Sequence, residues 1–356
     1  MPIEPPEDEA SIGYNYFDGG GITVHGPAMI VRKEVQGKTA IEAGARVDLV
    51  SSASIDVLTQ GSKFRETRKE YTFGASRIFD ETLLFSNYTL SDESDYTSNT
   101  LCLGLAHDLF EKNLTLTLSV SRAWDEVGDN SDPAFGEKGF NRSTYSLGLA
   151  QSFSPRLLAQ FNYEVTADEG YINSPYRNVL VGATLSASTF EPEVYPDART
   201  GQAFVIRSSY GFLSNTAGAG IGSTVQLSYR YYKDTFDVRS HTGKLFYQRH
   251  LSGHWLLGLF YQYHSQEAAS FYSDFFQKRL DFMARDKELS TFSDHWLGAS
   301  IKFKPTQKKW GKLANPYFKV GYSFILFDYD NFSDPRNQQL YSWEAHVFQT
   351  TVGFNY

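Results

Sequence analysis

Apolar side chains alternate with polar ones along most of this chain of 356 residues. The run 39–52 shows the pattern most clearly, because its apolar positions are Ile41, Ala43, Ala45, Val47 and Leu49. Successive side chains of a β-strand point to opposite faces, so a period of two indicates strands with one apolar and one polar face. The same period recurs up to the last residue, and the chain is therefore predicted to be all-β.

Turn residues between the alternating segments predict about sixteen strands, with about fourteen and eighteen as limits. The strands are expected near 10–18, 22–35, 39–52, 66–79, 82–91, 96–108, 113–124, 140–153, 156–167, 202–213, 223–233, 238–250, 254–266, 289–303, 316–328 and 341–356. Short connections at 36–37, 80–81, 111–113, 154–155 and 251–253 alternate with long polar ones at 53–65, 126–139, 169–199 and 268–288. Short periplasmic turns and long extracellular loops are typical of transmembrane antiparallel β-barrels, so we expect this fold.

Composition narrows the class of protein. The longest strongly apolar stretch, 255–261, is far shorter than the 18 or so residues that a membrane helix needs, which excludes a helical membrane bundle. Lys and Arg total 33 and Asp and Glu 41, a net charge of 33 − 41 = −8, and no basic stripe is present, so nucleic acid is not an expected partner. The single Cys102 excludes a disulfide framework and any multi-cysteine metal site.

The two faces of the predicted strands differ in the way that a membrane barrel requires. The apolar faces carry Tyr, Phe and Trp at segment ends with Leu, Val and Ala between them, as a lipid-facing band with aromatic girdles does. The opposite faces carry the candidates for the lining of a lumen, which are Glu42, Arg46, Asp48, Arg207, Arg230, Gln262, His264 and Gln266. Around Arg230 these side chains either bind an anion or brace the wall through hydrogen bonds, and the bracing network is favoured.

The two ends of the chain carry further signals. Phe348, Val352, Phe354 and Tyr356 alternate up to a terminal aromatic residue, as in the strand signal that the bacterial barrel-assembly machinery recognises. Residues 1–9 are acidic and rich in proline and do not form a secretory signal, so we expect a signal peptide to have been removed. The expected organisation is a periplasmic tail, 1–9, and one barrel domain, 10–356, in the lipid of the bacterial outer membrane.

Several segments together resemble a bacterial family of predicted outer-membrane barrels known as domain of unknown function 3570. They are residues 16–21 (YFDGGG), 26–27 (GP), 31–33 (VRK), 47–57 (VDLVSSASIDV), 95–96 (DY), 168–171 (DEGY), 174–177 (SPYR), 196–200 (PDART), 229–232 (YRYY), 240–242 (SHT) and 265–272 (SQEAASFY). The resemblance spans nearly the whole chain and implies a single barrel without an established activity. It also implies gene neighbourhoods with small lipoproteins, a flavin transferase and thioredoxin-like proteins, which point to envelope redox biology.

Two long loops contain candidate functional residues. The loop around 168–200 contains Asp168, Glu169, Tyr171, Tyr176, Arg177 and Arg199. Because loops longer than about 15 residues are usually functional or disordered, this one either folds inward and narrows a pore or forms an extracellular hairpin held by Arg–carboxylate pairs. The second loop holds four carboxylates that are candidate calcium ligands, Asp125, Glu126, Asp129 and Asp132. The regular calcium-loop pattern is absent, so a solvated acidic loop is favoured.

We expect a pore, or a gated or plugged channel, for small hydrophilic solutes. Signs are mixed in the expected lumen, which predicts no strong preference for anions or cations. The alternative is a scaffold that surrounds a lipoprotein, secreted or redox partner, because Leu256, Phe260, Ile325 and Phe327 fall on the inward face. A soluble all-β binding protein is a third reading. Neither catalysis nor a cofactor is expected, since there is no G-x-S-x-G motif and Ser240 and His241 would point to opposite sides of a strand.

Overall fold

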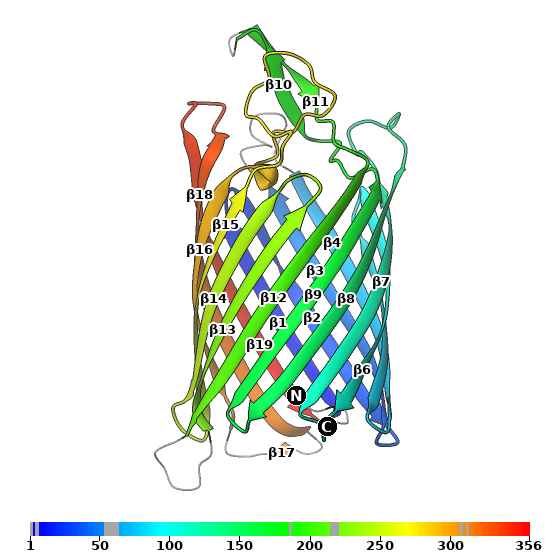
Figure 1. The fold of residues 1–356 in the computed structure, drawn as a ribbon, viewed down its shortest axis with the longest axis vertical. Coiled ribbons are helices and arrows are strands. Elements are labelled where there is room, and N and C mark those ends of the chain that lie inside the picture. Colours follow the sequence, from blue (N-terminus) through cyan, green and yellow to red (C-terminus); the bar gives the residue numbers. More distant parts are fainter. Residues whose placement is uncertain are drawn as a thin grey trace.

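The computed structural model describes residues 3, 7–52, 64–184, 187–213, 221–305, 309–310 and 313–356. Sixteen antiparallel strands of this part form one closed barrel, in which β1 pairs with β19 and β9 pairs with β12 (Figure 1). They are β1 (Glu9–Gly19), β2 (Ile22–Val35), β3 (Thr39–Ser52), β4 (Phe64–Phe79), β5 (Thr82–Asp92), β6 (Tyr96–Leu109), β7 (Leu114–Val127), β8 (Lys138–Ser154), β9 (Leu157–Gly170), β12 (Ala198–Leu213), β13 (Ile221–Asp234), β14 (Arg239–His250), β15 (Trp255–Glu267), β16 (Phe292–Phe303), β18 (Leu313–Ser333) and β19 (Leu340–Asn355). The prediction of an antiparallel barrel of about sixteen strands is confirmed.

Three short strands lie outside this set. β10 (Asn178–Gly182) and β11 (Ser188–Pro192) pair with each other and stand above the rim, and β17 (Lys309–Trp310) pairs with the start of β18 (Figure 1). The strand expected from residue 289 begins at Phe292, because Lys287–Leu289 form a 3-10 turn whose cap, Asp286, accepts a hydrogen bond from the Glu288 amide. Among the described residues, no helix has the length and apolarity to span a membrane.

Both chain ends lie at the same end of the barrel (Figure 1). The connections at that end include tight turns with left-handed backbone at Gln36 and Gly37 and at Asp80. Two-residue hairpin turns of this hand match the twist of the flanking strands. The long connections 128–137, 171–197 and 268–291 lie at the opposite end, and the expected long loop at 53–65 falls mostly outside the described residues. The predicted alternation of short and long connections is therefore present.

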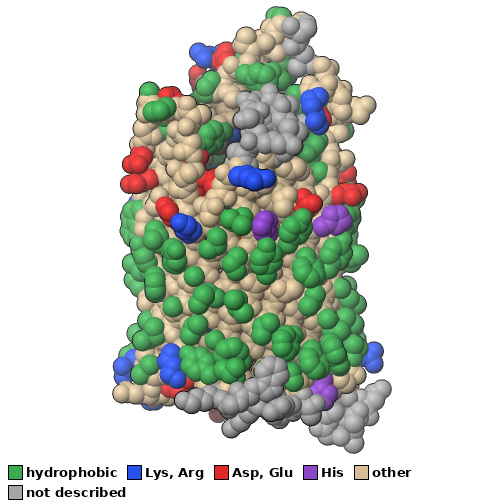
Figure 2. Space-filling view, turned by 180° about the vertical axis from the view of Figure 1, so that it is seen from behind, with side chains coloured by type: hydrophobic (Ala, Val, Ile, Leu, Met, Phe, Trp, Pro, Cys, Tyr) green, Lys and Arg blue, Asp and Glu red, His purple; other side chains and the backbone are tan. Residues whose placement is uncertain are grey.

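Apolar side chains cover the outside of the barrel. Ile12 is 57% exposed and Leu297 61% exposed, whereas their neighbours Ser11 and Trp296 face inward. Figure 2 shows the apolar side chains as a band around the wall, with histidine side chains along its upper edge and charged side chains above them. An apolar band of this kind is the surface that a barrel presents to lipid.

A repeated contact marks the upper edge of this band. In four hairpin pairs a tyrosine hydroxyl lies 2.6–2.8 Å from Nδ1 of a histidine on the next strand, and the pairs are Tyr14–His25, Tyr229–His241, Tyr261–His295 and Tyr322–His346. The eight residues lie on eight consecutive strands, from β13 through β19 and β1 to β2. Tyr88 makes the same diagonal contact with Asn99, at 2.6 Å. The predicted aromatic girdle therefore carries a polar partner for its hydroxyl groups on this half of the barrel.

Replacing Tyr261 by phenylalanine is expected to lower the free energy of unfolding by about 1 kcal/mol, because His295 loses its hydrogen-bond partner. Urea unfolding of the refolded barrel in lipid vesicles measures the change. The control is Tyr145→Phe, a tyrosine of the outer face whose hydroxyl makes no hydrogen bond within the described part of the chain. Equal stability of the two variants would contradict a stabilising role for the tyrosine–histidine pair.

Candidate functional site

The lumen is the candidate functional site, and every predicted lining residue lies on its inward face. Cross-strand register places Glu42, Arg46 and Asp48 of β3 on the face opposite to the exposed Ile41 and Leu49. The same reasoning places the other predicted lining residues inside, which are Arg207 of β12, Arg230 of β13 and Gln262, His264 and Gln266 of β15. Their chemical roles stay predictions.

The arginines on one wall of the lumen form ion pairs with carboxylates. Arg32 of β2 pairs with Glu42 at 2.5 Å, and Arg46 pairs with Asp48 two positions along β3 at 2.9 Å. Arg68 of β4 and Arg142 of β8 pair with Glu70 at 3.0 Å and Asp168 at 2.7 Å. On this wall, which runs from β2 to β9, positive charge is thus neutralised by an adjacent carboxylate.

Hydrogen bonds hold two of the predicted residues on the opposite wall. The Thr242 hydroxyl lies 2.8 Å from Nδ1 of His264, and Gln266 donates to the carbonyl oxygens of Glu288 at 2.7 Å and Ser290 at 3.1 Å. These contacts agree with the bracing network favoured from the sequence. They also tie the upper end of β15 to the loop that follows it.

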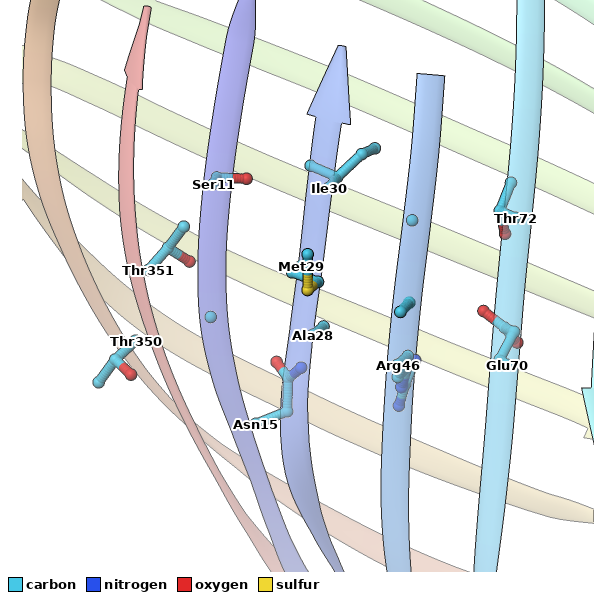
Figure 3. A pocket seen from close by; sticks show the side chains of 13 residues that line it. Ser11, Asn15, Ala28, Met29, Ile30, Arg46, Glu70, Thr72, Thr350 and Thr351 are labelled. Atoms are coloured by element: carbon cyan, nitrogen blue, oxygen red, sulfur yellow. The ribbon is translucent and has the colours of Figure 1, made fainter. Parts of the chain in front are cut away.

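A hollow of about 330 Å³ lies against the wall formed by β19, β1, β2, β3 and β4 (Figure 3). Its inward lining combines polar side chains, residues that have little or no side chain, and one larger apolar residue, Ile30: Ser11, Gly13, Asn15, Ala28, Ile30, Gly44, Arg46, Glu70, Thr72 and Thr351. Small residues leave space beside the charged groups, and the polar groups keep that space compatible with water. This part of the lumen wall therefore suits passage of a hydrated solute.

Aromatic side chains of the lumen cover glycines of neighbouring strands. A Cβ atom added to Gly298 would lie 2.2 Å from Cε1 of Phe260, and one added to Gly104 would lie 2.2 Å from Cζ of Phe85. The ring of Tyr317 covers Gly353 in the same way. Covering glycines with aromatic rings is a known way to stabilise a sheet, so these rings are part of the wall.

The long loops form a folded cap, by which we mean residues 171–184, 187–197 and 268–291. Val179, Val181, Phe276 and Met283 form a buried apolar cluster between the two loops. Polar contacts tie them together, since Arg177 pairs with Asp286 and the Glu193 carboxylate accepts a hydrogen bond from the Arg285 amide at 2.7 Å. The cap is joined to the rim at β13 and β18, where it meets Phe236 and Phe332.

The structure assigns the predicted residues of the first long loop to this cap and its base. Asp168 pairs with Arg142, Arg199 pairs with Asp234 at 2.5 Å, and Tyr176 donates to Asp95. Glu169 is exposed near the end of β9, and the centroid of the Tyr171 ring lies 4.6 Å from the Lys138 ammonium. β10 and β11 project beyond the rim, which matches the extracellular hairpin held by Arg–carboxylate pairs and not the inward fold.

The four candidate calcium ligands do not converge. Asp125 is buried on the inward face of β7 and accepts the hydroxyl hydrogen of Tyr96, whereas Glu126 is the next residue on the opposite face. Asp129 accepts hydrogen bonds from Ser131 and the Asp132 amide within its own loop. Asp125 and Glu126 thus belong to β7 and not to the expected loop, Asp129 and Asp132 lie in the connection that follows it, and the calcium assignment has no geometric support in the described residues.

Three other carboxylates, which the sequence did not single out as a site, lie together at the upper rim of the barrel. Oxygen atoms of Glu66, Glu93 and Asp95 lie within 4.8 Å of one another. Burial raises the pKa of Glu93 and of Asp95 above their ordinary values of 4.5 and 3.8, and the nearby Glu66 carboxylate raises both further. In the sequence, all three residues lie at or next to the upper ends of β4, β5 and β6, and this shared position could have identified the cluster.

These raised pKa values predict a pH dependence of the rim. Between the ordinary and the raised pKa the folded state binds more protons than the unfolded state, so local stability falls as pH rises through that interval. Lowering the pH from neutral to about 5 is expected to increase the hydrogen-exchange protection factor of the Gly128 amide, which donates to the Asp95 carbonyl at 2.7 Å. The double variant Glu66→Gln/Glu93→Gln should reduce the effect, because it removes one titrating carboxylate and the Glu66 charge that raises the pKa of Asp95, and an unchanged pH response would contradict the account.

The fold and the lumen define the class first: this is a β-barrel of the outer-membrane type, with an apolar outer band and a polar interior. The chain belongs to the family described as protein of unknown function (DUF3570), whose model matches residues 58–143 and 136–310. The family resemblance seen in the sequence is thereby confirmed. No curated protein matches the chain.

Solved structures share the fold at low sequence identity. One, described as a bacterial polysaccharide outer membrane secretin, has a TM-score of 0.56 at 9% identity and covers 99% of this chain and 100% of that chain. Another, OccD3 (OpdP) of Pseudomonas aeruginosa, has a TM-score of 0.50 at 10% identity and covers 98% and 91%. At these identities the likeness concerns the fold alone.

Proposed function

We propose that this protein is a channel for small hydrophilic solutes in the bacterial outer membrane, with a folded cap over part of its outer mouth. The carrying observation is the hollow beside Gly13 and Gly44, where small residues of the inward face leave space next to Arg46 and Glu70. A barrel of sixteen strands is wide enough for an aqueous channel. The description of one similar structure as an outer membrane secretin supports the same location.

The packing of the inward aromatic residues supports a channel over a barrel filled by a partner. Phe260 covers Gly298, Ile325 is buried, and Phe327 stacks on Trp343 with ring centroids 4.2 Å apart. Their apolar surface is therefore taken up by the wall and the cap, and it requires no plug. This weakens the argument for a scaffold that rested on Leu256, Phe260, Ile325 and Phe327.

A scaffold remains the second candidate because the cap exposes apolar side chains. Phe190, Leu280 and Phe282 are between 44% and 48% exposed, although the cap has a buried core of its own. Exposed apolar groups in an ordered segment are typical of a surface that contacts another protein. On this reading a lipoprotein or other envelope partner co-purifies with the wild type and is lost from the double variant Leu280→Ser/Phe282→Ser.

Swelling of protein-loaded liposomes in neutral sugars tests the channel. Vesicles containing the folded barrel are expected to swell in a pentose and to swell progressively less in larger saccharides, because the lumen limits solute size. Folding is verified by the shift of the band on heating before electrophoresis. Absence of swelling in the smallest sugar, with the folded band present, would contradict an open channel.

Membrane residence is tested separately by washing envelopes with alkaline carbonate. The apolar outer band predicts that the protein stays in the pellet until detergent is added. Release by carbonate alone would instead support a soluble all-β binding protein. The outcome is independent of whether the lumen conducts.

A further inference from the structure

The positively charged side chains of the lumen differ between its two walls. On the β2–β9 wall Arg32, Arg46, Arg68 and Arg142 are all paired with carboxylates. The wall from β12 to β18 carries five inward cations below the rim, which are Arg207, Arg230, Lys244, Lys302 and Lys319. Among the residues that the structure describes, none of these five forms an ion pair with a carboxylate.

The carboxylates on the β12–β18 wall do not balance these cations. Asp234 is engaged with Arg199 at the rim, at 2.5 Å. Asp294 of β16 lies directly opposite His264 of β15, and β16 is the fourth strand after β12, which carries Arg207. Lys302 and Lys319 are register partners whose side chains face the same side of the sheet. Like charges placed opposite each other are destabilising, and an anion between them would relieve the repulsion.

Aromatic rings accompany the unpaired cations. The Lys244 ammonium lies 4.6 Å from the centroid of Phe260 and 5.8 Å from that of Trp296. The Lys302 ammonium lies 3.6 Å from the Tyr317 ring, and the Arg230 guanidinium lies 5.1 Å from the Tyr232 ring. Three of the five cations thus stand beside an aromatic ring, so a solute with an acidic group and an apolar body meets both kinds of contact at one place.

We propose that the inward face of β12–β18 is a binding strip for organic anions and makes the channel selective for them. The acidic group is held by Lys244 and Arg230, and the apolar body lies against Phe260 and Trp296. The inference rests on the proposed channel function. It departs from the absence of ion preference expected from sequence, because the structure neutralises the arginines of one wall and leaves the cations of the other without carboxylate partners.

The reversal potential in a potassium chloride gradient tests the selectivity. The wild type is expected to pass chloride more readily than potassium, and the double variant Arg230→Gln/Lys244→Gln is expected to lose this preference. The control Arg68→Gln/Glu70→Gln removes one charge of each sign from the paired wall and is expected to keep it. If the wild type gives steps of current without anion preference, the proposed anion selectivity is wrong and the proposed channel function is unaffected. If folded protein gives no current, the proposed channel function is itself wrong.

Binding of benzenesulfonate to the detergent-solubilised barrel, measured by calorimetry, tests the strip without any need for conductance. Its affinity is expected to exceed that of methanesulfonate, which lacks the ring, and to fall about tenfold or more in Lys244→Gln, since a hydrogen bond to a charged group is lost. Phe260→Leu should weaken benzenesulfonate and leave methanesulfonate unchanged. Equal binding by wild type and Lys244→Gln, or no binding by the wild type, would overturn the proposal.

Discussion

Replacing Arg285 by alanine is expected to lower the local stability of the cap by about 3 kcal/mol. Arg285 is only 4% exposed and links the second cap loop to the end of β18, because its Nη2 donates to the Ser333 carbonyl oxygen at 2.7 Å. Its Nε donates to the Asp274 carbonyl at 3.2 Å, and its guanidinium covers the Phe332 ring at 4.7 Å. Alanine would leave these acceptors in a buried place without a donor.

Hydrogen exchange measures this loss directly. Val194 and Met283 exchange amide hydrogen bonds of 3.0 and 2.8 Å across the two cap loops, and their protection factors are expected to fall by about 100-fold in Arg285→Ala. The control is Arg279→Ala, which removes the exposed pair with Glu191 and is expected to cost less than about 1 kcal/mol. Equal exchange in the two variants would show that Arg285 does not hold the cap to the rim.

Replacing Gly298 by valine is expected to destabilise the barrel by about 3 kcal/mol or more. The new Cβ would lie 2.2 Å from the Phe260 ring and 2.9 Å from Cβ of Ser323, so the ring would have to leave the wall. The displaced ring would also enter the lumen, and conductance is expected to fall. Urea unfolding in vesicles gives the change in the free energy of unfolding.

Two further variants separate the ring contact from a general effect of valine. Gly243→Val adds the same side chain to β14 at a position with no heavy atom within 4 Å of the new Cβ, and its stability is expected to change by less than about 0.5 kcal/mol. The double variant Phe260→Ala/Gly298→Val is expected to be more stable than the sum of the single changes predicts, because the clash with the ring is gone and only the close contact with Ser323 remains. Additive losses would argue against the ring-over-glycine contact.

Much of the fold could be predicted because the alternation of apolar and polar residues identifies each strand without reference to the others. The alternation around Ile41 and Leu49 places Glu42, Arg46 and Asp48 on one face without any knowledge of neighbouring strands. The Arg46–Asp48 pair follows from that face alone, since the two residues are two positions apart. Positions inside a strand were therefore accessible from sequence.

Contacts between distant segments were not accessible in this way. β10 and β11 are each five residues long, and Phe276 and Met283, about ninety residues further along the chain, pack against this hairpin. Segments this short show no alternation of apolar and polar residues that would predict them. The contact of Phe260 with Gly298 depends on the register between β15 and β16. Lys244, Lys302 and Lys319 stand on the polar faces of predicted strands, but their lack of carboxylate partners emerges only when the two walls are compared.

Single-channel recording of the refolded wild-type protein in a planar bilayer, in molar salt, tests the central claim most directly. A lumen with a hollow lined by polar and small side chains, and with aromatic rings packed against its wall, predicts steady conductance steps of porin size. Folding is checked on the same preparation by the shift on heating. A folded protein that inserts into the bilayer and gives no steps would contradict the channel and direct attention to a barrel whose lumen is closed or filled by a partner.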